Sequence, residues 1–226
     1  RKKITDAGVD ASLYKDDSRP TTLKQRFRSN GKSLLRVNHL HKNSISKEIQ
    51  EQIINKIEFI IKDIDLLIFS DFNYGCLPQS LVENITAIAK ENKVLLAADS
   101  QSSSQIGDVG RFKDMDLITP TEIEARISTK DHENGLVVLV QKLQKQSNTP
   151  NVLLKIGEEG LLIHIDDDNS NDWHTDKINA LNSIVRDAAG AGDSLLITSA
   201  LILAVGGNIW EASVWDLWPQ LFKLGV

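Results

Sequence analysis

The feature that most constrains the fold is an alternation between helical segments with one apolar face and short, wholly apolar runs. Residues 46–64 place Ile49, Ile53 and Ile57 on one helical face, and DLLIFSDF follows them. A second helical stripe in residues 77–93 is followed by VLLAADS. Strands buried on both faces read as continuous apolar runs, and parallel strands need long crossover connections. The pattern therefore predicts βαβ units and a mostly parallel sheet covered on both faces.

The same alternation continues toward the C-terminal end of the chain. MDLITPT reads as a strand and EIEARIS as a short helix, and GLVVLVQKLQKQ reads as a longer helix. NVLLKIGEEGLLIHID predicts two strands about a Gly-Glu-Glu-Gly turn. No internal repeat or linker interrupts the series, so we expect a single domain, with an α/β core over residues 44–212 and a divergent tail over 213–226.

Residues 19–40 differ in character from this core. TLKQRF and KSLLRV have extended patterns, and the Asn30-Gly31 pair between them is a strong hairpin signal. We expect a small β hairpin that stands off the main sheet as a lid.

Composition excludes several classes of function. The 226-residue chain has a net charge of −5 and no basic block, so nucleic acid is not an expected partner. No apolar stretch reaches the roughly 18 residues of a membrane span. The single cysteine, Cys76, cannot form an internal disulfide and fits a reducing compartment, so we expect a cytoplasmic location.

Polar residues follow several of the predicted strands. They are Ser70-Asp71-Phe72, Asp99-Ser100-Gln101, Thr119-Pro120-Thr121 and Lys155. In parallel sheets, ligands bind beyond the carboxyl ends of the strands. These residues are therefore expected at one rim, where the candidate site would lie.

The stretch RDAAGAGDSLL indicates the chemistry of that rim. Gly190 and Gly192 suit a tight entry into a helix, and the N–H groups from Gly190 to Asp193 would form an anion site at its start. A carboxylate beside that anion site suits phosphoryl transfer to an alcohol, with Asp193 as general base and the Gly190-Ala191-Gly192 turn as anion hole. Asp193 could equally be a helix-start residue placed against the helix dipole.

No other chemical motif competes with this one. The sequence has no GxGxxG, P-loop, HExxH, CxxC or GxSxG pattern. A magnesium ion would need carboxylates, waters and nucleotide phosphates, and Glu124 is the best rim candidate. A helix-start carboxylate is the competing interpretation of Glu124.

Several segments together resemble one family. DAAGAGDS resembles the DTxGAGD signature of the ribokinase/PfkB sugar kinases, with Ala188 where Thr usually stands. LITPTEIEA is similar to the family's TPNxxEA segment, and LLKIGEEGLLI to its strand–Gly–x–x–Gly–strand element. IFSDFNYGCL and the PTTLKQRFRSNGKSLLRV segment resemble the heptose-phosphate kinases, the kinase half of ADP-heptose synthases. The matches occur in order over most of residues 10–212.

The resemblance implies a ribokinase-like three-layer fold, ATP, Mg²⁺ and transfer of the γ-phosphate to a hydroxyl of a sugar or sugar phosphate, with heptose phosphates among the candidates. By position, Asp193 would be the base, and Gly190, Ala191 and Gly192 the anion hole. Thr121, Glu124, Lys155 and Gly157 would border the nucleotide, with Glu124 reaching the metal through water. Asp71 and the hairpin residues Lys24, Arg26 and Arg36 would contact the sugar substrate. Capping of its loop is the competing role for Asp71, and a place on a solvated strand face is the competing role for the three cations. Family habit implies a homodimer through the hairpin.

Departures from the family pattern support a second hypothesis. Asn38, Tyr74, Ala188 and Thr121 stand where the pattern has other residues, and the family's opening strands have no counterpart before residue 10. The sequence therefore predicts that the N-terminal part of the domain is missing from the chain as given. The alternative function is a non-catalytic relative that binds nucleotide or sugar, or an inactive fragment.

Overall fold

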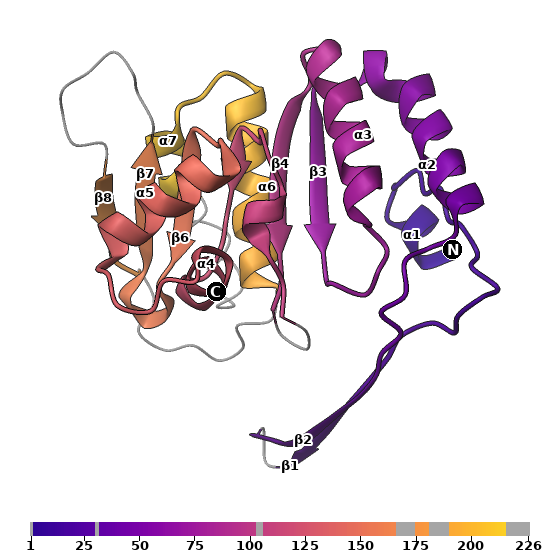
Figure 1. Cartoon of the computed structure of the whole chain (residues 1–226), viewed down its shortest axis with the longest axis horizontal. Coiled ribbons are helices and arrows are strands. Elements are labelled where there is room, and N and C mark those ends of the chain that lie inside the picture. Colours follow the sequence, from indigo (N-terminus) through magenta and orange to yellow (C-terminus); the bar gives the residue numbers. More distant parts are fainter. Residues whose placement is uncertain (1, 30–31, 103–105, 166–174, 181–189, 216–226) are drawn as a thin grey trace.

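The computed structural model of the chain describes residues 2–29, 32–102, 106–165, 175–180 and 190–215. Within these residues the main sheet has six strands in the order β3-β4-β5-β6-β7-β8 (Figure 1). The strands are β3 (Leu66–Asp71), β4 (Leu95–Ser100), β5 (Leu117–Ile118), β6 (Asn151–Lys155), β7 (Leu161–Ile165) and β8 (Thr175–Ile178). β3 to β6 run parallel, and β7 and β8 are added antiparallel. The predicted, mostly parallel sheet is therefore confirmed.

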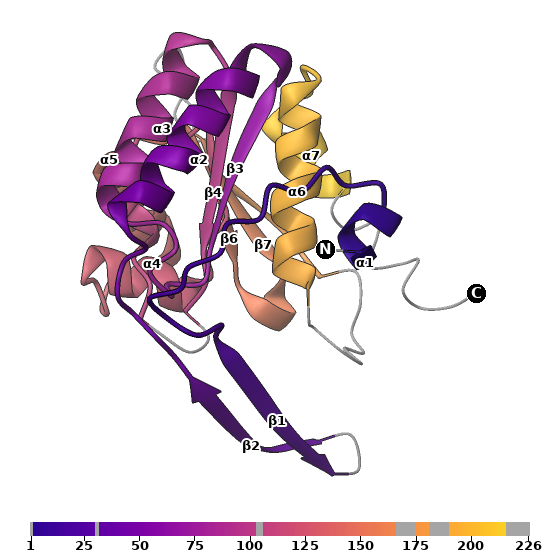
Figure 2. The same ribbon diagram turned by 90° about the vertical axis from the view of Figure 1, so that its right-hand side faces the viewer.

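Helices cover both faces of this sheet, as the side view in Figure 2 shows. One face carries α2 (Lys47–Ile60), α3 (Gln79–Glu91), α4 (Glu122–Thr129) and α5 (Leu136–Ser147); the other carries α6 (Ala191–Ala204) and α7 (Ile209–Trp215). The side chains between the layers form two apolar cores, one around Leu81, Leu139 and Ile118 and one around Leu117, Leu153 and Leu196. This is the expected three-layer arrangement.

The N-terminal hairpin forms a separate two-stranded sheet. β1 (Leu23–Ser29) pairs antiparallel with β2 (Lys32–His39), and the pair stands off the core in both views (Figures 1 and 2). A short helix, α1 (Lys2–Asp6), precedes it. The Asn30-Gly31 turn lies outside the described residues.

Several predicted elements are shorter than the sequence pattern suggested. The first helix of the core ends at Ile60 and continues as a 3₁₀ turn, Ile61–Asp63. The strand expected in MDLITPT has only two residues, because the Asp116 carboxylate accepts a hydrogen bond from Leu96 N and Thr121 already caps the next helix. The sequence predicted neither α1 nor β8. Of the tail, α7 is described to Trp215, and the remaining residues lie outside the description.

No helix within the described ranges is long and apolar enough to cross a membrane.

Candidate active site

The carboxyl ends of β3, β4, β5 and β6 meet at one rim, and the first turn of α6 lies beside them. Gly190 caps α6 with a φ of +82°, a backbone conformation that favours glycine. Asp193 lies in the first turn of α6. A Cβ built on Gly192 would come 3.3 Å from the Lys155 Nζ atom, so the ammonium group lies against this turn. A cation at the positive end of a helix dipole is unfavourable unless an anion shares the site.

Lys155 is held in this place by an ion pair with Asp99. Its Nζ atom lies 3.1 Å from Asp99 Oδ2, and only 2% of the Asp99 side chain is exposed. Burial raises the pKa of Asp99 to about 6, the Lys155 ammonium counteracts that rise, and the nearby Glu124 carboxylate adds to it. The other Asp99 oxygen, Oδ1, has no hydrogen-bond partner among the described residues. The pair therefore keeps the Lys155 ammonium at the start of α6. In return, the Asp99 carboxylate is buried with one oxygen unpartnered among the described residues.

The start of α4 forms a second wall of the rim. Thr121 caps the helix: its side chain accepts a hydrogen bond from Glu124 N, and Glu124 Oε2 accepts one from Thr121 N at 2.8 Å. Glu124 Oε1 also accepts a hydrogen bond from Ser102 N at 2.8 Å. Glu124 thus acts as the helix-start carboxylate that the sequence offered as the alternative, and it also ties α4 to the segment after β4.

Two other residues expected at the nucleotide complete this wall. Thr121 forms a parallel bridge with Lys155, which brings α4 and the end of β6 together. Gly157 opens the 3₁₀ turn between β6 and β7 with a φ of +64°, and the space where its Cβ would lie is open. The structure therefore groups Thr121, Glu124 and Lys155 closely, and Gly157 follows two residues after Lys155.

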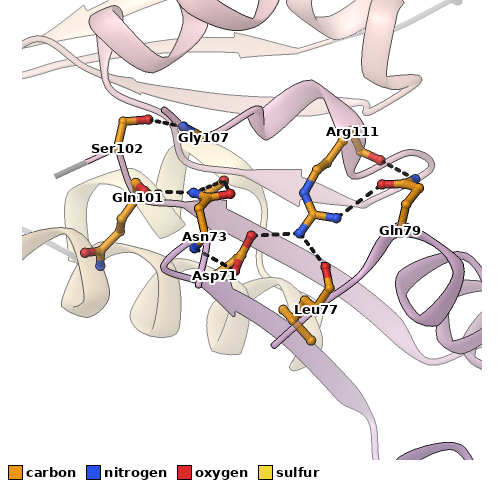
Figure 3. A network of polar contacts seen from close by, with 9 residues as sticks. Asp71, Asn73, Leu77, Gln79, Gln101, Ser102, Gly107 and Arg111 are labelled. Carbon is orange, nitrogen blue, oxygen red and sulfur yellow. Dashed lines mark hydrogen bonds and ion pairs between the residues drawn. The ribbon is translucent and has the colours of Figure 1, made fainter. Parts of the chain in front are cut away.

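An open cavity of about 400 Å³ lies at the carboxyl end of β3. Its lining residues are Lys42, Asp71, Asn73, Gly75, Leu77, Ile106 and Arg111. Arg111 Nη2 donates to Asp71 Oδ2 at 2.7 Å and to the Leu77 carbonyl at 2.9 Å, and its Nη1 donates to Gln79 (Figure 3). Asp71 Oδ1 accepts a hydrogen bond from Asn73 N. The Asp71 carboxylate therefore holds its own loop, as the capping interpretation predicts, while it also lines a cavity.

Two hydrogen bonds in series connect this cavity to Asp193. Asn73 Nδ2 donates to the Gln101 carbonyl at 2.9 Å (Figure 3), and Gln101 Nε2 donates to Asp193 Oδ1 at 2.9 Å. The rim thus contains the Asp193 carboxylate at the start of α6 and the Lys155 ammonium against the same helix turn. One residue, Gln101, connects Asp193 to the loop that lines the polar cavity.

The three cations expected on the hairpin are placed differently from one another. The Lys24 ammonium lies 5.0 Å from the ring centroid of Phe72 and 4.9 Å from that of Tyr74, so it contacts the loop after β3. Arg26 and Arg36 are cross-strand partners and both are exposed on the hairpin. The structure brings Lys24 to the cavity loop, residues 71–77, which ends β3 and lines the cavity. Arg26 and Arg36 lie on the part of the hairpin that projects from the core.

Sequence reasoning missed Arg111, Lys42, Asn73 and the role of Gln101. Arg111 lies in a loop that showed only a polar composition, and nothing in its spacing pairs it with Asp71, 40 residues earlier. Gln101 was placed at the rim, but its partner is 92 residues away. Only the assumption that strand ends share a rim could have suggested either contact.

The oxygen donors at the rim suit a magnesium ion that is held through water. No cluster of three or more His, Cys, Asp or Glu is gathered for a metal in the part of the chain that the structure describes. Both Glu124 oxygens accept main-chain hydrogen bonds, but a carboxylate has further lone pairs for a bound water. Mg²⁺ keeps several waters and is usually bound by one or two carboxylates plus substrate phosphates. Glu124 therefore fits an ion that arrives with a nucleotide and is held through water.

Curated proteins that share one name are similar to most of this chain. "Bifunctional protein HldE" of Helicobacter hepaticus is 27% identical over 215 residues, which are 93% of this chain and 42% of that protein. The same-named protein of Desulfatibacillum aliphaticivorans is 28% identical over 216 residues, with 93% and 42% covered. The chain therefore spans less than half the length of these curated relatives.

Solved structures share the fold at low identity. Escherichia coli phosphofructokinase-2 in complex with fructose-6-phosphate is 14% identical with a TM-score of 0.63, over 87% of this chain and 62% of that one. Arabidopsis thaliana ribokinase complexed with ribose and ATP is 15% identical with a TM-score of 0.60, over 87% and 60%. The family model described as "pfkB family carbohydrate kinase" matches residues 1–204. The chain accordingly belongs to the pfkB family of carbohydrate kinases.

Proposed function

We propose that this chain carries the phosphoryl-transfer site of an ATP-dependent sugar or sugar-phosphate kinase. The observation that carries the proposal is the first turn of α6, where Asp193 follows the Gly-Ala-Gly turn and the Lys155 ammonium lies against Gly192. Backbone N–H groups and a lysine suit the negative charge of a transferring phosphoryl group. A carboxylate at the same place suits the removal of a proton from the attacking hydroxyl.

In the proposed reaction, the acceptor hydroxyl oxygen forms a bond to the γ-phosphorus of ATP. The bond between that phosphorus and the β,γ-bridging oxygen breaks, and ADP leaves with the bridging oxygen. The hydroxyl proton passes to Asp193. Gly190, Ala191 and Gly192 supply N–H groups for the developing charge, and Lys155 and the α4 start with Thr121 and Glu124 border the phosphates. Gly157, in its open turn, leaves room for the nucleotide. A magnesium ion bound with ATP would neutralise phosphate charge, and Glu124 would hold it through water.

The proposed acceptor class rests on the cavity that two hydrogen bonds in series connect to Asp193. Its polar lining of Asp71 and Asn73 suits sugar hydroxyls, and Lys42 and Arg111 suit an anionic group. Lys24 on the hairpin lies over the cavity loop, and Arg26 and Arg36 extend the positive charge outward. A sugar phosphate, including a heptose phosphate, is therefore the proposed substrate. The resemblance of the IFSDFNYGCL segment to the heptose-phosphate kinases supports the same choice.

We also propose a homodimer and a cytoplasmic location. The hairpin exposes about half or more of Leu23, Phe27 and Leu35, and Phe27 faces Leu35 across the strands. A second copy of the chain would cover these apolar side chains. The cytoplasm supplies the ATP that the reaction needs.

The test is a coupled assay of ADP release from magnesium ATP, with a panel of heptose, ribose and fructose phosphates and free hexoses. We expect acceptor-dependent turnover that Asp193→Asn lowers by about 10²–10⁴-fold, the usual contribution of a general base. Asp63→Asn, which removes an exposed carboxylate from the 3₁₀ turn after α2, is the matched control and retains wild-type turnover.

Two outcomes would contradict the proposal. Turnover that Asp193→Asn leaves unchanged would remove Asp193 from the role of base. No turnover on any acceptor, with nucleotide still bound in a calorimetric titration, would instead favour the non-catalytic relative.

A further inference from the structure

The side chain of Gln101 makes the contact that fixes Asp193. Gln101 follows β4 directly, and its Nε2 atom donates to Asp193 Oδ1 at 2.9 Å. Within the part of the chain that the structure describes, this is the hydrogen bond that the Asp193 carboxylate accepts. It joins the end of one strand to the first turn of α6, two elements that no local sequence pattern links.

The main chain of Gln101 is itself held from both sides. Its N–H donates to the Asp71 carbonyl at 2.8 Å, and its own carbonyl accepts the Asn73 side chain at 2.9 Å (Figure 3). Asp71 is in turn fixed by Arg111 at 2.7 Å. The amide that contacts Asp193 therefore extends from a backbone bonded to the same loop that lines the cavity.

The contact between Gln101 and Asp193 suits a general base, because a base must be held in a fixed position. A base must lie within hydrogen-bond reach of the proton it takes, and a small misplacement can cost on the order of 10²-fold in rate. A carboxylate with one oxygen bonded to a neutral amide donor has its rotation restricted, while its second oxygen still has lone pairs for the hydroxyl.

We propose that Gln101 is a positioning residue for phosphoryl transfer: its amide holds the Asp193 carboxylate in the orientation that receives the acceptor proton, and ties that orientation to the cavity loop through Asp71 and Asn73. This inference rests on the proposed function, because Asp193 is the base only there. It adds a residue that acts through Asp193 rather than on the substrate.

The test compares Gln101→Leu, which removes the donor, with Gln101→Glu, which keeps the shape but places a carboxylate beside Asp193. We expect Gln101→Leu to lower kcat about 10–10²-fold with the KM for ATP within about twofold. We expect Gln101→Glu to move the acidic limb of the kcat profile to higher pH, because like charge raises the pKa of a neighbouring acid. Lys155, whose ammonium lies against Gly192 in the same helix turn, and its partner Asp99 are unchanged in both variants. Gln141→Glu on α5 is the charge-matched control.

A second readout does not depend on turnover. Carbon NMR follows the titration of the Asp193 carboxyl, assigned by the signal that Asp193→Asn removes. The proposal predicts that Gln101→Glu raises the pKa of Asp193 while Gln141→Glu leaves its titration as in the wild type.

A wild-type titration in Gln101→Glu, or an unchanged kcat in Gln101→Leu, would overturn the positioning role. An Asp193→Asn variant with full activity would overturn the proposed function, whatever the two Gln101 variants do. An inactive wild type would overturn the proposed function and, with it, the role of Gln101 in phosphoryl transfer, even if the titration of Asp193 shifts in Gln101→Glu.

Discussion

At the scale of single residues, the rim is organised by contacts between strand ends rather than by neighbours in sequence. Lys155 and Asp99 form one pair, and Gln101 and Asp193 another, each from two different elements. The Asp99 pair is the more costly of the two, because its carboxylate is buried with one oxygen unpartnered among the described residues. Burial of such a group is typical of a site selected for chemistry rather than for stability.

Asp99 makes the stability of the fold depend on pH. Burial is the largest cause of the rise in the pKa of Asp99 from 3.8 to about 6. The folded state therefore binds the proton of the Asp99 carboxyl more tightly than the unfolded chain does. The stabilisation that the proton provides is complete below about pH 4 and is lost as the pH rises through about 6. We expect the free energy of unfolding of the wild type to fall, relative to that of Asp99→Asn, by on the order of 2–3 kcal/mol between pH 4 and pH 7.

Urea unfolding of both proteins at a series of pH values measures this difference. Asp63→Asn is the control for the loss of one carboxylate and is expected to parallel the wild type. A gap between the wild type and Asp99→Asn that stays constant across the series would show that Asp99 titrates alike in the folded and unfolded states.

At the scale of elements, the start of α4 shows how a helix cap also builds a site. Thr121 and Glu124 exchange two hydrogen bonds in a capping box, and the same glutamate fixes Ser102 after β4. The sequence TPTEIEA carries the cap signal, with a Thr three residues before a Glu. Residues that we propose to face the phosphates are therefore also residues that determine where a helix begins.

Removal of this cap has a predictable cost. Thr121→Ala loses the oxygen that accepts from Glu124 N, and we expect the free energy of unfolding to fall by about 0.5–2 kcal/mol. Thr121→Ser keeps the oxygen and is expected to stay close to the wild type. Chemical denaturation measures both, and equal loss in the two variants would assign the effect to the threonine methyl group instead of the cap.

At the scale of the whole molecule, most of the architecture was predictable and most of the site contacts were not. Apolar runs and helical stripes are local signals, so the parallel strands, their covering helices and the rim at the strand ends could be predicted from sequence. β8 could not, because TDKI is a short, partly exposed edge strand without an apolar pattern. The pairs Arg111–Asp71 and Gln101–Asp193 depend on how loops meet, which no periodicity encodes.

The projecting hairpin predicts how copies of the chain associate. Phe27→Ser combined with Leu35→Ser removes the exposed cross-strand apolar pair, and we expect it to shift the molar mass in light scattering from that of a dimer to that of a monomer. Arg26→Ser with Arg36→Ser, the neighbouring pair on the other face, is the matched control. An unchanged mass in the apolar double variant would place any dimer contact elsewhere.

The central claim is that Asp193 takes a proton from a sugar hydroxyl as that oxygen accepts the γ-phosphoryl group. The most direct measurement is mass spectrometry of the acceptor, combined with ADP quantification, for the wild type and Asp193→Asn. The account predicts one phosphorylated acceptor for each ADP in the wild type and a loss of about 10²–10⁴-fold in the rate of both products in the variant. ADP formed without a phosphorylated acceptor, or equal product from both proteins, would contradict it.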